Sequence, residues 1–463
     1  MTNSSTTSPA ARDAPVVSPF LLPFLCIAQF MVFLDISIVN VALPSIRESL
    51  DIAADDLQYV VTTYGTVLGG FLLLGGRLAD RWGRRRMLQA GLALFAISSL
   101  VAGVAGSAGV LIGARGVQGL GASLITPAAL SILMSSFPPG PARNKALGIW
   151  GSLTGIASVF GVMLGGVITD GPGWRWIFWI NVPIGLAAVA LAVVVLPESR
   201  GVVRRFDVLG AVLLTSGLLL LIHTFDESVD AGWTSDSSLA GFGGAAVLLI
   251  AFVVREWVTT SPLLPLGIFR LERLRQANLA SIAVMGAVTT LFFFASLFMQ
   301  QVLEYSPMET GLAYVPLASS VAAAAGGASV LVGRFPLRAV LAVGLIATAS
   351  ALVMLSRLTA DASYTADLLP AFVLVGVGLG LAFVPLSVMA LDGVREADSG
   401  MAAGLISTSQ EAGGAVGLAI ASSVALTRST QLGGFQDAFL VAAGCILVAL
   451  LLSARLPRGG GGG

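Results

Sequence analysis

The sequence predicts an all-α membrane protein with fourteen transmembrane helices, arranged as two six-helix bundles with two extra central helices. Of the 463 residues, 56% are hydrophobic and only 11% are charged, whereas about 25% of the residues in a soluble domain are charged. The hydrophobic residues gather in runs that reach the roughly 20 residues a membrane-spanning helix needs. This composition excludes a soluble globular enzyme.

Charged residues and clusters of Pro, Gly and Asp separate these runs and set the expected ends of each span. The first six spans are expected at 18–43, 57–76, 87–106, 109–133, 145–169 and 176–196. The two central spans are expected at 207–223 and 239–257. The last six are expected at 276–302, 309–333, 338–357, 367–390, 401–427 and 434–455.

The spans divide the chain into segments. Residues 18–200 are expected to form the N-terminal six-helix bundle, 201–258 the two additional helices, and 259–458 the C-terminal six-helix bundle. Residues 1–17 are rich in Ser, Thr and Pro and are expected to be a disordered cytoplasmic tail. Residues 459–463 are a glycine tail that resembles a linker.

The basic residues predict the side of the membrane on which each loop lies. With both termini in the cytoplasm, the outer loops hold only Arg47, Arg175, Arg357 and Arg428 of the 25 basic residues, and Arg115 lies within a span. Such an excess of basic residues inside follows the positive-inside rule. We therefore expect a multi-pass membrane protein with both termini in the cytoplasm.

The sequence lacks the residues that several kinds of chemistry require. The only lysine, Lys145, is not part of a phosphate-binding loop, and no hydrolase or dinucleotide motif occurs. Cys26, Cys445 and a single histidine supply neither a metal site nor a disulfide framework. Basic and acidic residues balance at 25 each, so no global field attracts nucleic acid. We expect no enzyme activity, metal or cofactor, which leaves an ion gradient as the energy source.

Three ionisable residues inside the expected spans are candidates for proton coupling: Asp35, Arg115 and Glu411. A charged side chain at the centre of a membrane costs roughly 2.5–3.5 kcal/mol on insertion scales, so each should face a partner or a cavity. Gln118 lies three residues after Arg115, on the same helix face. Each residue also has an alternative explanation. Asp35 could make a structural hydrogen bond, and Glu411 could lie near a membrane surface. The long side chain of Arg115 could reach a membrane surface.

The loop after the second expected span is dense in glycine and charge, and we interpret it as a cytoplasmic gating loop. Its residues include Gly76, Asp80, Arg81, Gly83, Arg84 and Arg85. The glycines permit a tight turn, and Asp80 can face the positive N-terminus of a helix in the other bundle. The arginines can bind carboxylates or lipid phosphates. The alternative is a purely topogenic role in which the arginines hold the loop inside.

The chain resembles the fourteen-span drug/proton antiporter branch of the major facilitator superfamily over residues 18–457. Residues 76–86, GRLADRWGRRR, fit the superfamily loop motif G-x-L-A-D-R-x-G-R-R. The first span, with Asp35 and the run VNVALP at 39–44, is similar to a motif of this branch. The resemblance implies that Asp35 takes part in proton coupling or cation binding and that Arg115 takes part in proton transfer.

The fifth expected span is rich in glycine and resembles the antiporter motif of this branch. Its glycines are Gly151, Gly155, Gly161, Gly165 and Gly166. The sequence departs from the motif at Val162, where the motif has proline. Glycines four residues apart share a helix face and allow close packing, so an ordinary helix interface is the alternative explanation.

Aromatic and amide residues in the spans are candidates for a substrate cavity: Gln29, Phe33, Tyr64, Trp150, Phe293, Gln300 and Gln410. They suit a bulky amphipathic molecule, but equally suit interfacial belts and packing. The expected function is proton-coupled export of drugs, antibiotics or similar amphipathic small molecules by alternating access. We expect a monomer that contacts membrane lipids and binds no nucleic acid.

Two other functions stay open at this point. One is an exporter or proton symporter dedicated to one endogenous metabolite. The other is a membrane scaffold or sensor that does not transport.

Overall fold

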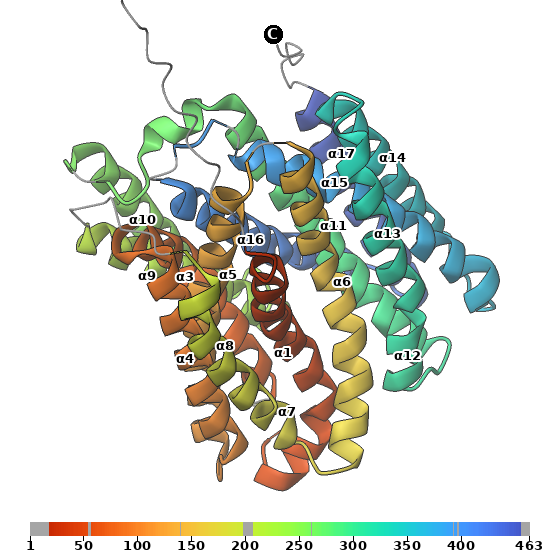
Figure 1. Ribbon diagram of the computed structural model, residues 1–463. Helices are drawn as coiled ribbons and strands as arrows, with labels where there is room; N and C mark the ends of the chain where they lie inside the picture. The colour runs from red at the N-terminus through yellow and green to blue at the C-terminus, as the bar shows by residue number, and fades with distance from the viewer. Residues whose placement is uncertain are drawn as a thin grey trace, which may run out of the picture.

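The computed structural model describes residues 18–53, 57–138, 140–197, 207–260, 262–391, 393–395 and 398–454. The regular secondary structure of these residues is entirely helical (Figure 1). Twelve of the described helices are long and apolar enough to cross a membrane. The predicted class of an all-α membrane protein is therefore confirmed. The count of fourteen is not, because α6 and α16, with 30 and 28 residues, are not among the twelve.

The first group of helices precedes the central pair. These helices are α1 (Leu21–Leu50), α3 (Tyr59–Trp82), α4 (Arg84–Gly103), α5 (Ala108–Ser136), α6 (Pro141–Asp170), α7 (Trp176–Trp179) and α8 (Asn181–Val195). Within the group, α5 packs against α3 and α4, and α1 packs along α6. The two central helices that follow are α9 (Val208–Ala231) and α10 (Asp236–Val258).

The second group begins with a short 3₁₀ turn and continues to residue 454. It consists of η1 (Leu266–Arg270), α11 (Glu272–Gln301), α12 (Pro307–Ala313), α13 (Val315–Leu331), α14 (Leu337–Leu355), η2 (Tyr364–Leu368), α15 (Leu369–Leu391), α16 (Ser399–Leu426) and α17 (Gln431–Ala454). Here α15 packs between α13 and α14, while α11 packs against α16 and α17. The predicted tails at 1–17 and 459–463 lie outside the described residues.

Some helices end elsewhere than the sequence predicts. Pro44 was expected to close the first span, but α1 continues through it to Leu50. The reason is packing, because Ile38, Ala42 and Ile46 lie at helical spacing on one buried face. Proline is tolerated inside a membrane helix when its neighbours satisfy the backbone.

Two expected spans are interrupted. The span at 176–196 divides into α7 and α8, and the span at 309–333 divides at Tyr314 into α12 and α13. Pro183 and Pro316 follow these breaks closely, in the first turn of α8 and α13. A proline has no N–H to donate, so it fits the start of a helix better than its interior.

The two groups meet along several helices. α3 and α5 pack against α16, while α6 packs against α12, α13 and α15. The central helix α9 packs on α10, and it also contacts α3 and α16 (Figure 1). α9 therefore touches one helix from each group.

Candidate functional site

The first group of helices encloses a buried ion pair between Asp35 of α1 and Arg115 of α5, with 0% of either side chain exposed. Arg115 Nε also donates to the backbone oxygen of Val60 on α3 at 2.9 Å. Its guanidinium carbon lies 4.2 Å from the centre of the Tyr64 ring, in a cation–π contact. Arg115 therefore does not extend to a surface. It is held between three helices, where only a paired charge is tolerated.

Further polar side chains surround this pair. Arg115 Nη1 donates to Gln118 Oε1 at 2.7 Å. Gln118 Nε2 donates to Asp35 Oδ1 at 2.8 Å and to Ser99 Oγ at 2.6 Å. Asn181 Nδ2 donates to the same Asp35 oxygen at 3.0 Å. All of these side chains are buried, so α1, α4, α5 and α8 share one closed hydrogen-bond network.

The sequence analysis did not select Ser99 and Asn181 as site residues. The available signal was their polarity within otherwise apolar spans, because a polar group in the membrane core needs a partner. Gln118 was expected on the face of Arg115 and donates to Asp35 as well. The structural alternative for Asp35 also stays open, since its carboxylate joins α5 and α8 to α1.

Glu411 lies near the middle of α16, outside this network. Its side chain is exposed and makes no hydrogen bond or ion pair with another described residue. A methyl carbon built on Gly69 of α3 would lie 3.4 Å from Glu411 Cβ and 2.8 Å from Ile222 Cδ1 of α9. Glu411 therefore lies where α3, α9 and α16 meet, and the structure does not join it to Asp35 and Arg115.

Asp80, near the end of α3, binds the start of α16. Its carboxylate accepts the backbone N–H of Gly400 at 2.9 Å and that of Met401 at 2.7 Å. The first N–H groups of a helix have no partner within that helix and carry partial positive charge, so a carboxylate binds well there. This contact joins the two groups of helices.

Glycine makes the crossing of α3 and α16 close. A methyl carbon on Gly76 would lie 2.1 Å from the carbonyl oxygen of Gly400, well inside van der Waals contact. Ser131 Oγ of α5 and Ser399 Oγ of α16 lie 2.8 Å apart beside this crossing. We call the contacts of Gly76, Asp80 and Ser131 with residues 399–401 the α3–α16 latch.

Arg77 extends the latch, although the sequence analysis did not select it as a site residue. Its guanidinium pairs with Asp398 at 3.0 Å and donates to the carbonyl oxygen of Pro262 at 3.1 Å. Arg395 pairs with the same Asp398 at 2.6 Å. Arg77 occupies the x position of the G-x-L-A-D-R motif, so the motif gave no signal for it.

The predicted gating loop also includes Gly83, Arg81, Arg84 and Arg85. Gly83 separates α3 from α4 with φ 100°, a left-handed conformation that favours glycine. Arg85 Nη1 donates to the carbonyl oxygens of Val193 and Leu196, both at 3.4 Å. Arg84 is buried, and the Arg81 guanidinium lies 5.6 Å from the Trp82 ring centre.

The end of α10 is tied to the segment that leads into α11. Glu256 of α10 accepts the backbone N–H of Leu263 at 3.1 Å and that of Leu264 at 2.9 Å. Arg77 binds Pro262 in the same segment. We call residues 262–264 with these contacts the α10–α11 strap, which the sequence analysis did not predict.

Asp207 stabilises the start of α9. Burial alone would raise its pKa, but the Gly210 N–H at 3.0 Å and the Arg255 guanidinium at 2.9 Å lower it below the usual range. Asp207 therefore stays ionised and caps the helix.

The glycines of α6 make close contacts on two sides. Methyl carbons on Gly161 and Gly165 would lie 2.4 Å from Ser37 Cβ and 3.0 Å from Val41 Cβ, both on α1. Those on Gly151 and Gly166 would meet the second group, at Phe383 of α15 and Met308 of α12. The surroundings of Gly155 and Val162 lie outside the described part of the chain.

The predicted cavity residues differ in their exposure. Tyr64 belongs to the Asp35–Arg115 network, and its hydroxyl donates to Val32 O at 3.4 Å. Trp150 is buried, Phe33 and Gln410 are half-buried, and Phe293 and Gln300 are exposed. Gln29 is fully buried, and its amide atoms have no hydrogen-bond partner among the described residues. Gln29 is thus a buried polar side chain whose amide is not satisfied by the described residues.

Comparisons with known proteins add independent findings. The Major Facilitator Superfamily model matches residues 25–418. The cephamycin export protein CmcT of Amycolatopsis lactamdurans is 38% identical over 452 residues, covering 94% of this chain and 92% of that protein. The lincomycin resistance protein of Streptomyces lincolnensis is 35% identical, covering 93% and 90%. The puromycin resistance protein pur8 of Streptomyces alboniger is 35% identical, covering 86% and 80%.

A solved structure has a similar fold. The human organic anion transporter MFSD10 (TETRAN) superimposes with a TM-score of 0.70, covering 94% of this chain and 98% of that chain. Its sequence is 16% identical, so this likeness concerns the fold alone.

Proposed function

The chain belongs to the Major Facilitator Superfamily, and from that premise we propose that it is a secondary transporter that exports antibiotics or similar amphipathic small molecules. The names of the cephamycin, lincomycin and puromycin relatives support this assignment. The twelve apolar helices support a multi-pass membrane protein.

The proposed topology has fourteen spans with both termini in the cytoplasm. α6 and α16 supply the fifth and thirteenth spans, since their 30 and 28 residues exceed the roughly 20 that a span needs. α9 and α10 are the seventh and eighth. This topology places the latch and the strap on the cytoplasmic side.

Proton coupling is proposed to act on the buried Asp35–Arg115 pair, and this pair is the observation that carries the proposal. A proton that binds Asp35 neutralises the carboxylate, whereas the guanidinium of Arg115 stays charged. A buried cation without a counter-charge is unfavourable by several kcal/mol, which favours a different packing of α1 and α5. Release of the proton restores the pair and the original packing.

Alternating access is proposed to require opening of the latch. The crossing of α3 and α16 holds the cytoplasmic ends of the two groups together through Asp80 and Arg77. The α6–α1 contacts at Gly161 and Gly165 could transmit a change in α1 to the second group, because α6 also packs on α12 and α15. Substrate would bind between the groups, near the bilayer midplane.

The test uses purified protein in liposomes with an imposed pH gradient and an internal pH dye. Lincomycin and puromycin serve as the first substrates. In wild type, substrate should evoke proton flux. Asp35→Asn should abolish this flux while energy-independent substrate exchange persists, because asparagine mimics the protonated carboxyl. Asp437→Asn is the control, since Asp437 pairs with Arg428 away from the network.

The outcomes separate coupling from export. Unchanged proton flux in Asp35→Asn would exclude Asp35 as the obligatory proton carrier and shift the assignment to Glu411. Substrate export without proton flux in wild type would refute proton coupling but leave export standing.

Export of one dedicated compound is the second candidate function. The observation that favours it is that the cephamycin, lincomycin and puromycin relatives are each named for a single antibiotic. Growth of a drug-sensitive host that expresses the chain, tested against a panel of antibiotics and lipophilic cations, distinguishes the two. Protection against a single compound indicates a dedicated exporter.

A further inference from the structure

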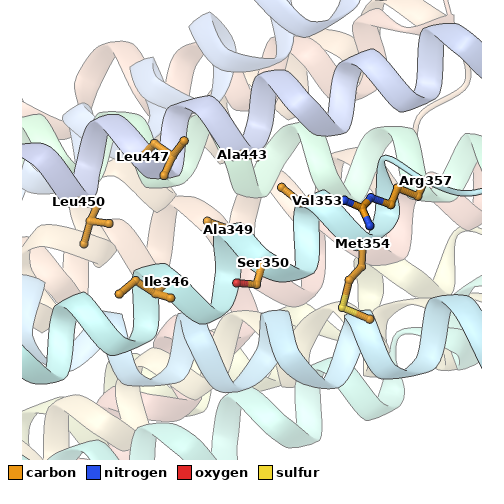
Figure 2. A pocket seen from close by; sticks show the side chains of 9 residues that line it. All are labelled: Ile346, Ala349, Ser350, Val353, Met354, Arg357, Ala443, Leu447 and Leu450. Atoms are coloured by element: carbon orange, nitrogen blue, oxygen red, sulfur yellow. The ribbon is translucent and has the colours of Figure 1, made fainter.

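A groove of about 370 Å³ runs between α14 and α17 (Figure 2). Its walls are mainly apolar and include Ile346 and Val353 of α14 with Leu447 and Leu450 of α17. Ile346 is 53% exposed and Leu447 is 51% exposed, so the walls face away from the bundle interior. In a membrane protein, an outward apolar surface of this kind contacts acyl chains.

Arg357 lies at one end of the groove, beside Met354 (Figure 2). Within the described part of the chain, its guanidinium makes no ion pair or hydrogen bond. Gln436 of α17 donates to the carbonyl oxygen of the next residue, Leu358, at 2.8 Å, which places Arg357 near the start of α17. The nearby Arg428 differs, because it pairs with Asp437. No described carboxylate therefore forms an ion pair with the guanidinium of Arg357.

The length of the groove matches one leaflet of a bilayer. From Ile346 to Arg357 the chain rises roughly 16 Å at about 1.5 Å per residue. The hydrocarbon core of a bilayer is about 30 Å thick, so half of it is about 15 Å. A single acyl chain therefore reaches along the groove when its headgroup lies beside Arg357.

We propose that the α14–α17 groove binds an anionic phospholipid, with one acyl chain between Ile346 and Leu447 and the phosphodiester paired with Arg357. A net anionic headgroup, such as that of phosphatidylglycerol, supplies an ion-pair partner for Arg357. A zwitterionic headgroup supplies it less well, because its own cation competes for the phosphate. The proposed topology places this lipid in the outer leaflet, whereas the groove itself does not depend on the topology.

The experiment is native mass spectrometry of the full chain in mild detergent, titrated with phosphatidylglycerol or phosphatidylcholine of identical acyl chains. Wild type should bind phosphatidylglycerol more tightly than phosphatidylcholine. Arg357→Gln should weaken phosphatidylglycerol binding about fivefold, the equivalent of the roughly 1 kcal/mol that one arginine contributes near anionic lipid. Ser350→Phe, which fills the groove from an exposed position, should weaken binding of both lipids.

Arg428→Gln is the matched control and should bind phosphatidylglycerol as wild type does, because Arg428 is already paired. Equal phosphatidylglycerol affinity in wild type and Arg357→Gln would overturn the proposal, as would equal affinity of wild type for both lipids. A dimer that Ser350→Phe abolishes, without lipid binding in wild type, would assign the groove to a second copy of the chain. Transport does not enter these measurements, so they do not depend on the proposed function.

Discussion

At the scale of single residues, Asp35 is held by three side-chain donors, Arg115 and Gln118 of α5 and Asn181 of α8. These donors give the buried carboxylate hydrogen-bond partners in place of water. Each donor also fixes the direction of the carboxylate, so the network positions Asp35 as well as stabilising it. The residues around Asp35 should therefore affect coupling without binding substrate themselves.

Asn181→Leu tests this positioning role. Leucine removes the donor to Asp35 at 3.0 Å while keeping the branched shape and the number of side-chain heavy atoms. A hydrogen bond to a charged group contributes about 1.5–3 kcal/mol, so we expect proton flux to fall about tenfold or more. Substrate binding, measured by equilibrium dialysis of the purified protein, should stay near the wild-type value. Wild-type flux in this variant would remove Asn181 from the coupling machinery.

Asp80→Asn tests the latch at a single carboxylate. Asparagine has one acceptor oxygen, whereas aspartate has two. It also lacks the negative charge that interacts favourably with the N-terminus of α16. We expect export to fall severely while the amount of protein in the membrane is unchanged. Drug accumulation in cells and a blot of the membrane fraction measure these two quantities. Asp437→Asn, which removes a carboxylate paired with Arg428, should export normally. Normal export by Asp80→Asn would leave the loop a topogenic charge cluster.

At the scale of elements, α6 acts as a spacer between α1 and the second group because glycine lines both of its sides. Gly161 allows α6 to approach Ser37 of α1, and Gly151 allows it to approach Phe383 of α15. Van der Waals packing at such small residues is the main attraction between helices in lipid.

Gly161→Ala should disturb this spacing. Its methyl carbon would lie 2.4 Å from Ser37 Cβ, so the two helices must separate. Overpacking of this kind costs typically 1–3 kcal/mol, which we expect as a lower thermal unfolding temperature in detergent. Gly113→Ala is the matched control, because no atom lies within 4 Å of a methyl carbon there. Equal unfolding temperatures for the two variants would contradict the close contact.

The strap gives α9 and α10 a mechanical role. Glu256 holds the segment that precedes α11, and Arg77 holds the same segment from the first group. Glu256→Gln should weaken the two backbone hydrogen bonds, because a carboxylate is a stronger acceptor than an amide. We expect faster amide hydrogen exchange at Leu263 and Leu264, with slower export. Glu227→Gln, at the other end of α9, should leave exchange in this segment unchanged.

At the scale of the whole molecule, the two groups of helices are joined by hydrogen bonds at the latch. Ser131→Cys combined with Ser399→Cys, in a chain with Cys26 and Cys445 replaced by Ala, tests whether this junction must open. The two hydroxyls lie 2.8 Å apart, so the paired cysteines should form a disulfide. Oxidation should stop export and a reductant should restore it.

The control pair for this experiment is Asn278→Cys with Ser409→Cys, because these side chains contact each other within the second group. A disulfide there should leave export intact. Full export by the oxidised Ser131–Ser399 cysteine pair would show that the latch need not open during transport.

The sequence predicted the class of fold well because long apolar runs have few possible structures in a membrane. It also pointed to Asp35, Arg115 and Gln118, since a polar residue in such a run is conspicuous. The sequence could not show which side chains of distant spans pair with each other. Asn181 and Asp35 are far apart in the chain, as are Arg77 and Asp398, so no local pattern links them. The same limit applies to the candidate cavity residues, because an aromatic or amide side chain in a span does not reveal which way its helix faces.

The neutrality of the Asp35–Arg115 pair has an electrical consequence. While the two residues are paired, they contribute no net charge, so membrane voltage does no work on the movement of this site. Once a proton neutralises Asp35, the charge of Arg115 remains, and a full crossing at 100 mV is worth about 2.3 kcal/mol. A membrane voltage that is negative inside therefore drives the protonated site inward. It has no effect on the deprotonated site, in which Asp35 and Arg115 are paired. With one proton per cycle, export of a neutral drug carries current, whereas export of a monovalent cation is electrically silent.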